Sequence, residues 1–227
     1  TTDYAVKAEM LRDWGSWDSD FRAMTATLRA KLLAMLGAPA GEFDCVPLQG
    51  SGSYCVEAML GSFLPRDGKA LVLANGAYGL RAAETMRYLG RAFTLIDKGD
   101  YLPPRGAEVA AALAFDPAIT HVVAIHCETS SGILNPIAEI AEATAAAGRK
   151  LLIDSMSGFG ALPLDPAGIV FEAMVSRATP PIAIRWWPAC AGWASRRCWP
   201  NAGCRRSSSP SSPRPTRPSI SPASTRR

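Results

Sequence analysis

Along the first three quarters of the chain, short apolar runs alternate with longer segments that have helical spacing. The apolar runs lie at 70–74, 92–96, 121–125, 150–154 and 171–176, and helix-like segments such as 78–89 and 136–147 lie between them. Apolar strands that alternate with helices are typical of a parallel sheet covered by helices on both faces. The pattern therefore predicts an α/β fold.

The ends of two helices can also be predicted. Near the N-terminus, apolar residues at spacings of three and four form one helical face, with Phe21, Met24, Leu28, Leu32 and Met35. Asp18 or Ser19 is placed to cap this helix. For the segment 136–147, we expect Asn135 to be the cap and Gly148 to end the helix.

The composition changes abruptly after Ser176. The segment 177–227 holds ten Arg, nine Pro and nine Ser, with no Lys, Asp or Glu. Since the chain has 24 basic and 20 acidic residues, residues 1–176 keep 24 − 10 = 14 basic residues and a net charge of −6. We therefore divide the chain into 1–176 and a basic, low-complexity tail, 177–227, that we expect to be disordered.

Nothing in the sequence predicts a membrane protein. The apolar runs are far shorter than the ~20 residues that span a bilayer, and residues 1–10 lack the apolar stretch of a signal peptide. The six cysteines show no paired metal-ligand spacing, so reduced thiols and a cytoplasmic location are the expectation.

Four segments carry candidate chemistry. Residues 49–54 (QGSGSY) precede a helix, where free backbone amides bind phosphate, although such a turn is more often only a turn. Tyr78, in NGAYGLR after a strand, is either a stacking platform for a flat ring or a cover for the sheet edge. Residues 126–132 (HCETSSG) add hydroxyls and a carboxylate, and we give His126 no acid–base role.

Asp154 ends a predicted strand. A buried carboxylate at this position needs a cation or several hydrogen-bond donors to stay ionised. The alternative is that Asp154 caps a helix or binds a metal.

Together these segments resemble a known family. QGSGSYCVE (49–57), NGAYGLR (75–81), HCETSSGILNP (126–136) and IDSMSGFGALPLD (153–165) are similar to the successive motifs of class V, fold-type I aminotransferases. Within that class they most resemble the 2-aminoethylphosphonate–pyruvate aminotransferases, and DWGSWDSD (13–20) is similar to an early segment of that group. The resemblance covers about residues 1–176.

The resemblance implies an incomplete three-layer large domain that uses pyridoxal 5'-phosphate and works as a homodimer. Ser51, Gly52 and Ser53 would hold the cofactor phosphate and Tyr78 would stack on its ring. Thr129 would contact the ring substituents, and Asp154 would pair with the ring nitrogen. The implied reaction moves the amino group of 2-aminoethylphosphonate to pyruvate, which gives phosphonoacetaldehyde and alanine. An alanine–glyoxylate or serine–pyruvate aminotransferase is the alternative within the class.

The chain departs from the family where the cofactor-binding lysine is expected. That motif resembles S-S-A-N-K, but this chain has Pro180 at the lysine position. The five lysines are Lys7, Lys31, Lys69, Lys98 and Lys150, so none follows Asp154. We predict that the chain lacks transaminase activity, and we interpret the tail as translation in a shifted frame, with no strand after Ser176.

The tail also allows a different class of function. Its arginines would neutralise nucleic-acid phosphates, and Trp186, Trp187, Trp193 and Trp199 would stack on bases. We do not favour this, because no known binding module surrounds these groups. Cys190, Cys198 and Cys204 lack a CxxC pair and indicate zinc only weakly.

Overall fold

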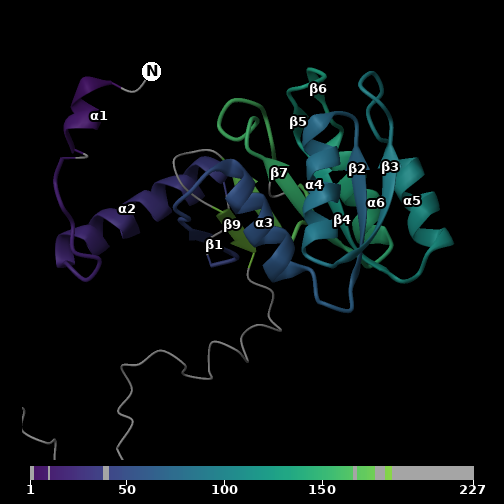
Figure 1. Ribbon diagram of the computed structural model, residues 1–227, viewed down its shortest axis with the longest axis horizontal. Helices are drawn as coiled ribbons and strands as arrows, with labels where there is room; N and C mark the ends of the chain where they lie inside the picture. Colours follow the sequence, from purple (N-terminus) through teal and green to yellow (C-terminus); the bar gives the residue numbers. More distant parts are fainter. Residues whose placement is uncertain (1–2, 10, 38–40, 166–167, 177–181, 186–227) are drawn as a thin grey trace, which may run out of the picture. The chain divides into compact units, whose positions relative to one another are not determined.

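The computed structural model describes residues 3–9, 11–37, 41–165, 168–176 and 182–185 (Figure 1). Pro180 and most of the tail predicted to be disordered lie outside these residues, whereas residues 182–185 of that tail are described and form a strand. The described helices are α1 (Tyr4–Glu9), α2 (Ser19–Leu36), α3 (Gly52–Phe63), α4 (Ala77–Tyr88), α5 (Gly106–Phe115) and α6 (Ile137–Ala146). The strands are β1 (Phe43–Val46), β2 (Lys69–Ala74), β3 (Ala92–Asp97), β4 (Ile119–Ile125), β5 (Cys127–Glu128), β6 (Ile133–Leu134), β7 (Lys150–Ser155), β8 (Ala173–Ser176) and β9 (Ile182–Arg185).

Seven of these strands form one sheet in the order β1-β9-β8-β7-β4-β2-β3. Strands β8, β7, β4, β2 and β3 run parallel to one another. Strand β9 is antiparallel to both β8 and β1. A separate antiparallel hairpin, β5–β6, follows β4. The predicted α/β class and mostly parallel sheet are confirmed.

Strand β9 corrects the prediction that no strand follows Ser176. Val175 pairs with Ile182, and Ile182 in turn pairs with Val46 of β1. Four residues inside a Pro- and Arg-rich segment give too short a pattern for sequence reading, because pairing with β8 and β1 is what makes them a strand. The described chain therefore covers the edge of β8 with its own backbone.

Three details of the predicted helices also differ. Asp18 precedes α2 as predicted, but its side chain makes no capping hydrogen bond. Of the predicted apolar face, Leu32 is buried while Met24 and Met35 are exposed. The contact of α2 with the main core is made by Leu33 and Leu36 instead. Asn135 is not the cap of α6, which begins after Pro136; its side chain is used elsewhere, as described below. Gly148, at φ 66°, ends that helix as predicted.

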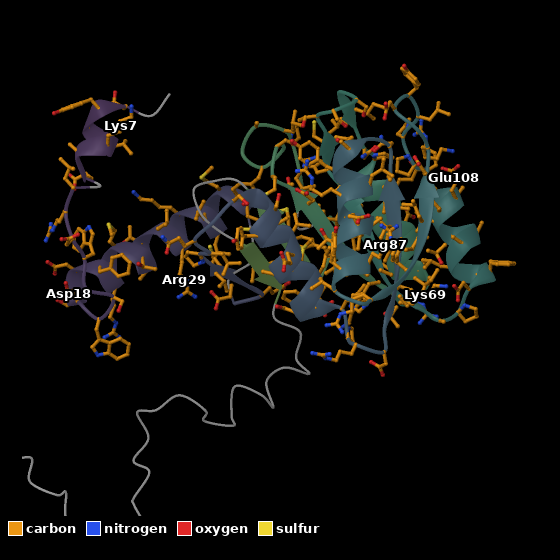
Figure 2. The ribbon with its side chains drawn as sticks, viewed as in Figure 1. Lys7, Asp18, Arg29, Lys69, Arg87 and Glu108 are labelled. Carbon is orange, nitrogen blue, oxygen red and sulfur yellow. The ribbon has the colours of Figure 1, made fainter. Side chains whose placement is uncertain are left out.

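Ion pairs tie the ends of strands to neighbouring helices. At the start of β2, Lys69 Nζ lies 2.6 Å from a carboxylate oxygen of Asp116, and Lys98 after β3 lies 2.5 Å from Glu108 of α5. Figure 2 labels Lys69 and Glu108 on these elements. These contacts fix the loops that connect the layers.

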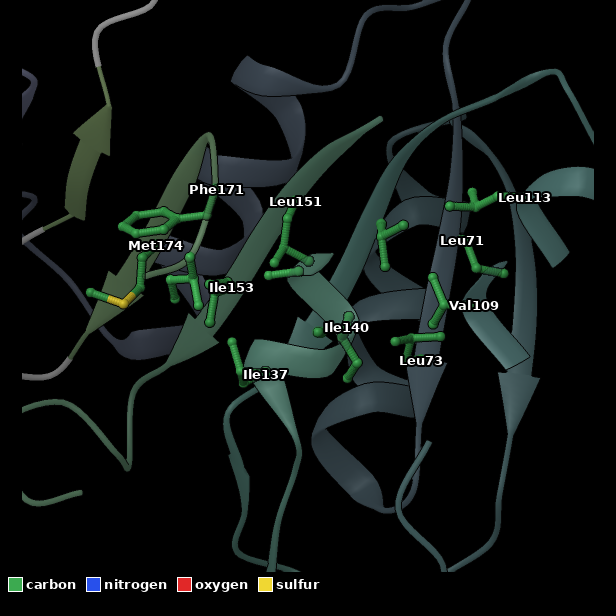
Figure 3. Packing of buried hydrophobic residues seen from close by; sticks show 14 of the residues in the cluster. Leu71, Leu73, Val109, Leu113, Ile137, Ile140, Leu151, Ile153, Phe171 and Met174 are labelled. Atoms are coloured by element: carbon green, nitrogen blue, oxygen red, sulfur yellow. The ribbon is translucent and has the colours of Figure 1, made fainter. Parts of the chain in front are cut away.

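The alternation of side chains along the strands creates a core on each face of the sheet. Leu71, Leu73, Leu151 and Ile153 face α5 and α6, as in Figure 3. The residues between them face α3 and α4 instead, where Val72 and Leu152 pack with Met59 and Met86. Each fully buried aliphatic side chain stabilises the fold by about 1.5–3 kcal/mol relative to exposure. The result is the predicted three-layer arrangement.

Candidate active site

Three neighbouring strands end at the same edge of the sheet, and their last residues form the floor of a cavity. The register pairs Ile125 of β4 with Asp154 of β7, and Ser155 of β7 with Ser176 of β8. Ile125, Asp154 and Ser176 all line a cavity of about 660 Å³. Ligands of parallel α/β sheets bind at the carboxyl ends of the strands, and this volume suits a small cofactor.

The cavity brings together every site residue that the sequence predicted. Its lining includes Ser51, Gly52, Ser53, Tyr78, Thr129 and Asp154. These residues come from segments as far apart as the start of α3 and the end of β7. Their roles in holding a cofactor stay predictions, but their convergence on one hollow is a feature of the fold.

The start of α3 forms one wall. Ser51 has an extended backbone and its side chain makes no capping hydrogen bond. Because the first N–H groups of a helix have no partner within the helix, the amides of Gly52 and Ser53 are left for a ligand at the positive end of the helix dipole. This arrangement suits the phosphate of a cofactor.

Asp154 supplies the negative charge of the cavity. Its side chain is buried, and Oδ1 accepts a hydrogen bond of 2.9 Å from the backbone N–H of Met156. Burial raises the pKa of Asp154 from 3.8 to about 6; this hydrogen bond opposes the rise and the charge of Glu128 adds to it. Among the described residues, the structure records no cationic side chain in an ion pair with Asp154. A buried carboxylate in this setting suits a ligand that brings its own positive charge.

Tyr78 and Arg81, one turn apart on α4, also line the cavity. Tyr78 is 41% exposed, and the guanidinium carbon of Arg81 lies 5.1 Å from the centre of its ring. Among the described lining residues, Arg81 carries the positive charge. Sequence reading assigned Arg81 no role, because a single arginine on an exposed helix face gives no signal of its own.

Thr129 belongs to the turn of the β5–β6 hairpin, beyond the end of β4 (Figure 1). The hairpin closes through hydrogen bonds from Gly132 N to Glu128 O and from Asn135 N to His126 O. Within the sheet edge, buried Asn75 and Asn135 exchange two side-chain hydrogen bonds of 2.9 and 3.1 Å. These amides join the loops after β2 and β4, and they explain why Asn135 does not cap α6.

His126, to which the sequence analysis gave no acid–base role, lies beside the cavity-forming loops. Its side chain is buried, and burial lowers its pKa. Nδ1 lies 2.9 Å from the hydroxyl oxygen of Ser155. A Cβ atom on Gly158 would lie 2.4 Å from the same Nδ1, so only glycine fits against the ring.

The chain is similar to curated proteins over a length of 178 residues. No protein-family model matches the sequence. The chain is 72% identical over 178 residues to 2-aminoethylphosphonate–pyruvate transaminase 1 of Paraburkholderia xenovorans, and 68% identical over 178 residues to the transaminase of that name from Rhizobium meliloti. Each alignment covers 78% of this chain and 46% of the relative, so the chain spans about half the length of the curated relatives it matches.

Solved structures show the fold. The ureidoglycine–glyoxylate aminotransferase of Bacillus subtilis matches with a TM-score of 0.73 at 16% identity, over 88% of this chain and 53% of that one. The pyridoxamine–pyruvate aminotransferase of Mesorhizobium loti matches with a TM-score of 0.71 at 23% identity, over 87% and 51%. The fold is that of a fold-type I aminotransferase large domain. The resemblance that the four motifs indicated is thereby confirmed.

Proposed function

We propose that the described residues are the cofactor-binding part of a pyridoxal 5'-phosphate-dependent transaminase of 2-aminoethylphosphonate and pyruvate. The observation that carries this proposal is the cavity, which unites the six residues predicted from the motifs around a buried carboxylate. The 48–72% identity to proteins named for this reaction supports the substrate pair.

Each residue has a role in this proposal. The amides and hydroxyls at Ser51, Gly52 and Ser53 hold the phosphate, and Tyr78 stacks on the ring. Asp154 keeps a proton on the ring nitrogen, where the carboxylate gains the positive partner that its buried position lacks. Thr129 contacts the ring substituents from the hairpin turn. When bound, the cofactor supplies an electron sink for the substrate carbanion.

The chain itself is proposed to bind the cofactor without covalent attachment and without turnover. The last lysine is Lys150, at the amino end of β7 on the opposite edge of the sheet from the cavity. Proline has no amine, so Pro180 cannot replace the family's lysine. The aligned length of 176–178 residues is close to the number of residues up to Ser176, which supports the interpretation that the reading frame changes there.

The alternative substrate pair is less well supported. An alanine–glyoxylate aminotransferase from Nostoc has a similar fold, with a TM-score of 0.72, but only 19% identity. Identity at that level reflects the fold alone. We therefore keep 2-aminoethylphosphonate and pyruvate as the proposed substrates. The nucleic-acid-binding alternative depends on the four tryptophans of the tail, which lie outside the described residues.

We further propose a cytoplasmic homodimer. Exposed apolar side chains on and near the first two helices, Tyr4, Leu11 and Trp17, offer a surface for a second subunit. Sedimentation analysis tests the dimer: a monomer at micromolar concentration would contradict it.

The cytoplasmic location is supported by the thiols. Cys45, Cys55 and Cys127 are free, as expected in a reducing compartment. Within the described residues, every helix is too short or too polar to cross a membrane.

Cofactor binding is tested on the full chain with pyridoxal 5'-phosphate followed by borohydride reduction and peptide mass spectrometry. We expect saturable binding and no reduced adduct in the peptides that follow Asp154. A stoichiometric adduct there would contradict the proposal of non-covalent binding, whereas no saturable binding at all would contradict the assignment of the cavity.

The reading frame is tested by sequencing the gene across codons 170–185 and expressing a corrected gene. A one- or two-base correction that restores the lysine motif and the following domain is expected to restore transamination of 2-aminoethylphosphonate with pyruvate. Pro180→Lys alone is expected to restore none, because the rest of the active-site wall would still be absent. An intact frame that no such correction improves would disprove the shifted-frame interpretation.

A further inference from the structure

Glu128 is the most deeply buried acidic residue next to the cavity, yet it does not line it. Its exposed fraction is 0%. One carboxylate oxygen accepts hydrogen bonds from the backbone N–H groups of Tyr78 and Gly79, at 3.0 and 3.1 Å. These groups are in the first turn of α4, where N–H groups have no partner within the helix. Glu128 therefore caps α4 from the hairpin, across 50 residues of sequence.

Ser130 completes this cap. Its hydroxyl donates to the second carboxylate oxygen of Glu128 at 2.7 Å and accepts from the backbone N–H of Ala77 at 2.8 Å. The cap thus engages three successive amides at the start of α4. The same three residues, Ala77 to Gly79, carry Tyr78 at their centre.

The backbone approaches closely enough that the preceding residue must be glycine. A Cβ atom on Gly76 would lie 2.4 Å from the hydroxyl oxygen of Ser130 and 2.6 Å from Cγ of Glu128. The motifs NGAYG and HCETSSG therefore fit one another as two halves of a single contact. Neither motif shows this by itself, because the contact exists only where the loops after β2 and β4 meet.

We infer that Glu128, with Ser130, is a positioning residue that holds Tyr78 against the ligand cavity. The inference rests on the proposed function, since it concerns how the ring wall of that cofactor site is held. A carboxylate is suited to the task because both of its oxygens accept hydrogen bonds, and because negative charge is stabilised at the positive end of a helix. A glutamine at this position would replace one accepting oxygen with an NH₂ group, which cannot accept a hydrogen bond from these donors.

The test measures binding of pyridoxamine 5'-phosphate to the full chain by calorimetry. This probe carries the phosphate and ring but has no aldehyde to react with surface lysines. Glu128→Gln is expected to weaken binding about tenfold, the size of one lost charged cap. Ser130→Ala is the second variant, because it perturbs the fold less than Glu128→Gln. It is expected to weaken binding about threefold, because it removes only the hydrogen bonds of a neutral hydroxyl.

The decisive measurement is the coupling to Tyr78. In a Tyr78→Ala background, Glu128→Gln and Ser130→Ala are expected to have almost no further effect on affinity, since the group that they position is gone. Glu108→Gln is the matched control: Glu108 also accepts from a backbone N–H at a helix start, that of Arg105 at 2.9 Å, but on α5 away from the cavity. It is expected to change thermal stability without changing affinity.

The outcomes separate this inference from the proposed function. If the unmodified chain does not bind the probe, both are wrong. If it binds and Glu128→Gln binds equally well, or if the loss is the same in the Tyr78→Ala background, the positioning role alone is wrong. A loss that disappears in that background supports the inference.

Discussion

In the part of the chain that the structure describes, the two ends of the central strands treat their carboxylates differently: Glu172 at the amino ends has basic partners, whereas buried Asp154 at the carboxyl ends has no recorded ion pair. Glu172, just before β8, contacts His121 at 3.0 Å and Lys150 at 2.5 Å. Burial tends to raise the pKa of Glu172, but the hydrogen bonds from His121 and Lys150 outweigh it, and its pKa is lowered. At the opposite end, Asp154 has one backbone donor and a pKa raised to about 6.

This difference separates structural from functional charge. A carboxylate that the protein has already neutralised contributes to stability and has little left to offer a ligand. A carboxylate that the protein leaves without a cation costs stability until a ligand supplies one. Glu172 is less buried than Asp154, with 16% of its side chain exposed against 6% for Asp154. Burial tends to raise the pKa of both carboxyls, and only the partners of Glu172 outweigh it, so the partners distinguish the two roles.

The largest expected effect is on ligand affinity at the carboxyl end. Asp154→Asn should weaken the binding of pyridoxamine 5'-phosphate about a hundredfold, ~2.7 kcal/mol, because the protonated ring nitrogen loses a buried counter-charge. Calorimetry measures this. The same substitution should leave the thermal midpoint unchanged or raise it, and a large fall in midpoint would show that Asp154 is structural.

A second test compares how stability depends on pH at the two ends. The pKa of Asp154 is raised on folding, so its contribution to unfolding free energy is present below pH 3.8 and lost as the pH rises through about 6. The pKa of Glu172 is lowered, so its contribution is present above pH 4.5 and lost as the pH falls below that value. We expect these contributions to have opposite signs of slope, with that of Asp154 on the order of 2 kcal/mol.

The measurement is urea unfolding between about pH 3 and 7 of the chain without ligand, compared with Asp154→Asn and Glu172→Gln. Subtracting each variant from the parent isolates one group from the other titrating residues. Two slopes of the same sign would contradict the contrast between the two ends.

Glu172→Gln should lower the unfolding free energy by about 1–3 kcal/mol near pH 7, because His121 is buried and loses a charged partner. Ligand affinity should not change, since Glu172 lies at the other end of the strands from the cavity. Urea midpoints and calorimetry on the same samples check both statements. An affinity loss comparable to that of Asp154→Asn would mean that the two ends are not independent.

The smallest effect is expected for the exposed half of the same cluster. The Lys150 side chain is 52% exposed, so Lys150→Met should cost no more than about 0.5 kcal/mol. Its urea midpoint should fall between those of the parent and Glu172→Gln. A cost equal to that of Glu172→Gln would show that Lys150, rather than His121, is the main partner.

Much of the central fold could be predicted because β2, β4 and β7 are continuous apolar runs buried on both faces, and β3, although partly exposed at the end of the sheet, is also a continuous run. Strands β2, β3, β4 and β7 lie within two residues of their predicted bounds, and α4 and α6 within one. The Ala-rich helix α5 and the two-residue strands of the β5–β6 hairpin were not predicted, because a uniform composition or a very short element gives no period to read. Strand β9 was excluded for its Pro- and Arg-rich surroundings, although pairing with β1 and β8 made it a strand.

The sequence by itself determined which side chains are the candidates for the chemistry. Ser51, Tyr78, Thr129 and Asp154 stand in motifs whose residue types suit a phosphate, a flat ring and a ring nitrogen, and the missing lysine is a fact of the sequence. Sequence analysis also separates residues 1–176 from the tail, because composition is a local property that needs no fold to be read.

Only the tertiary structure decided which groups meet. It placed Asn135 against Asn75 rather than on a helix, and it joined Glu128 to the start of α4 across 50 residues. It also placed His121 and Lys150 against Glu172, and among the described residues it placed no cation in an ion pair with Asp154. The physical reason is that hydrogen bonds and charge act over a few ångströms of space, and the parallel order of β2, β4, β7 and β8 sets which loops come that close.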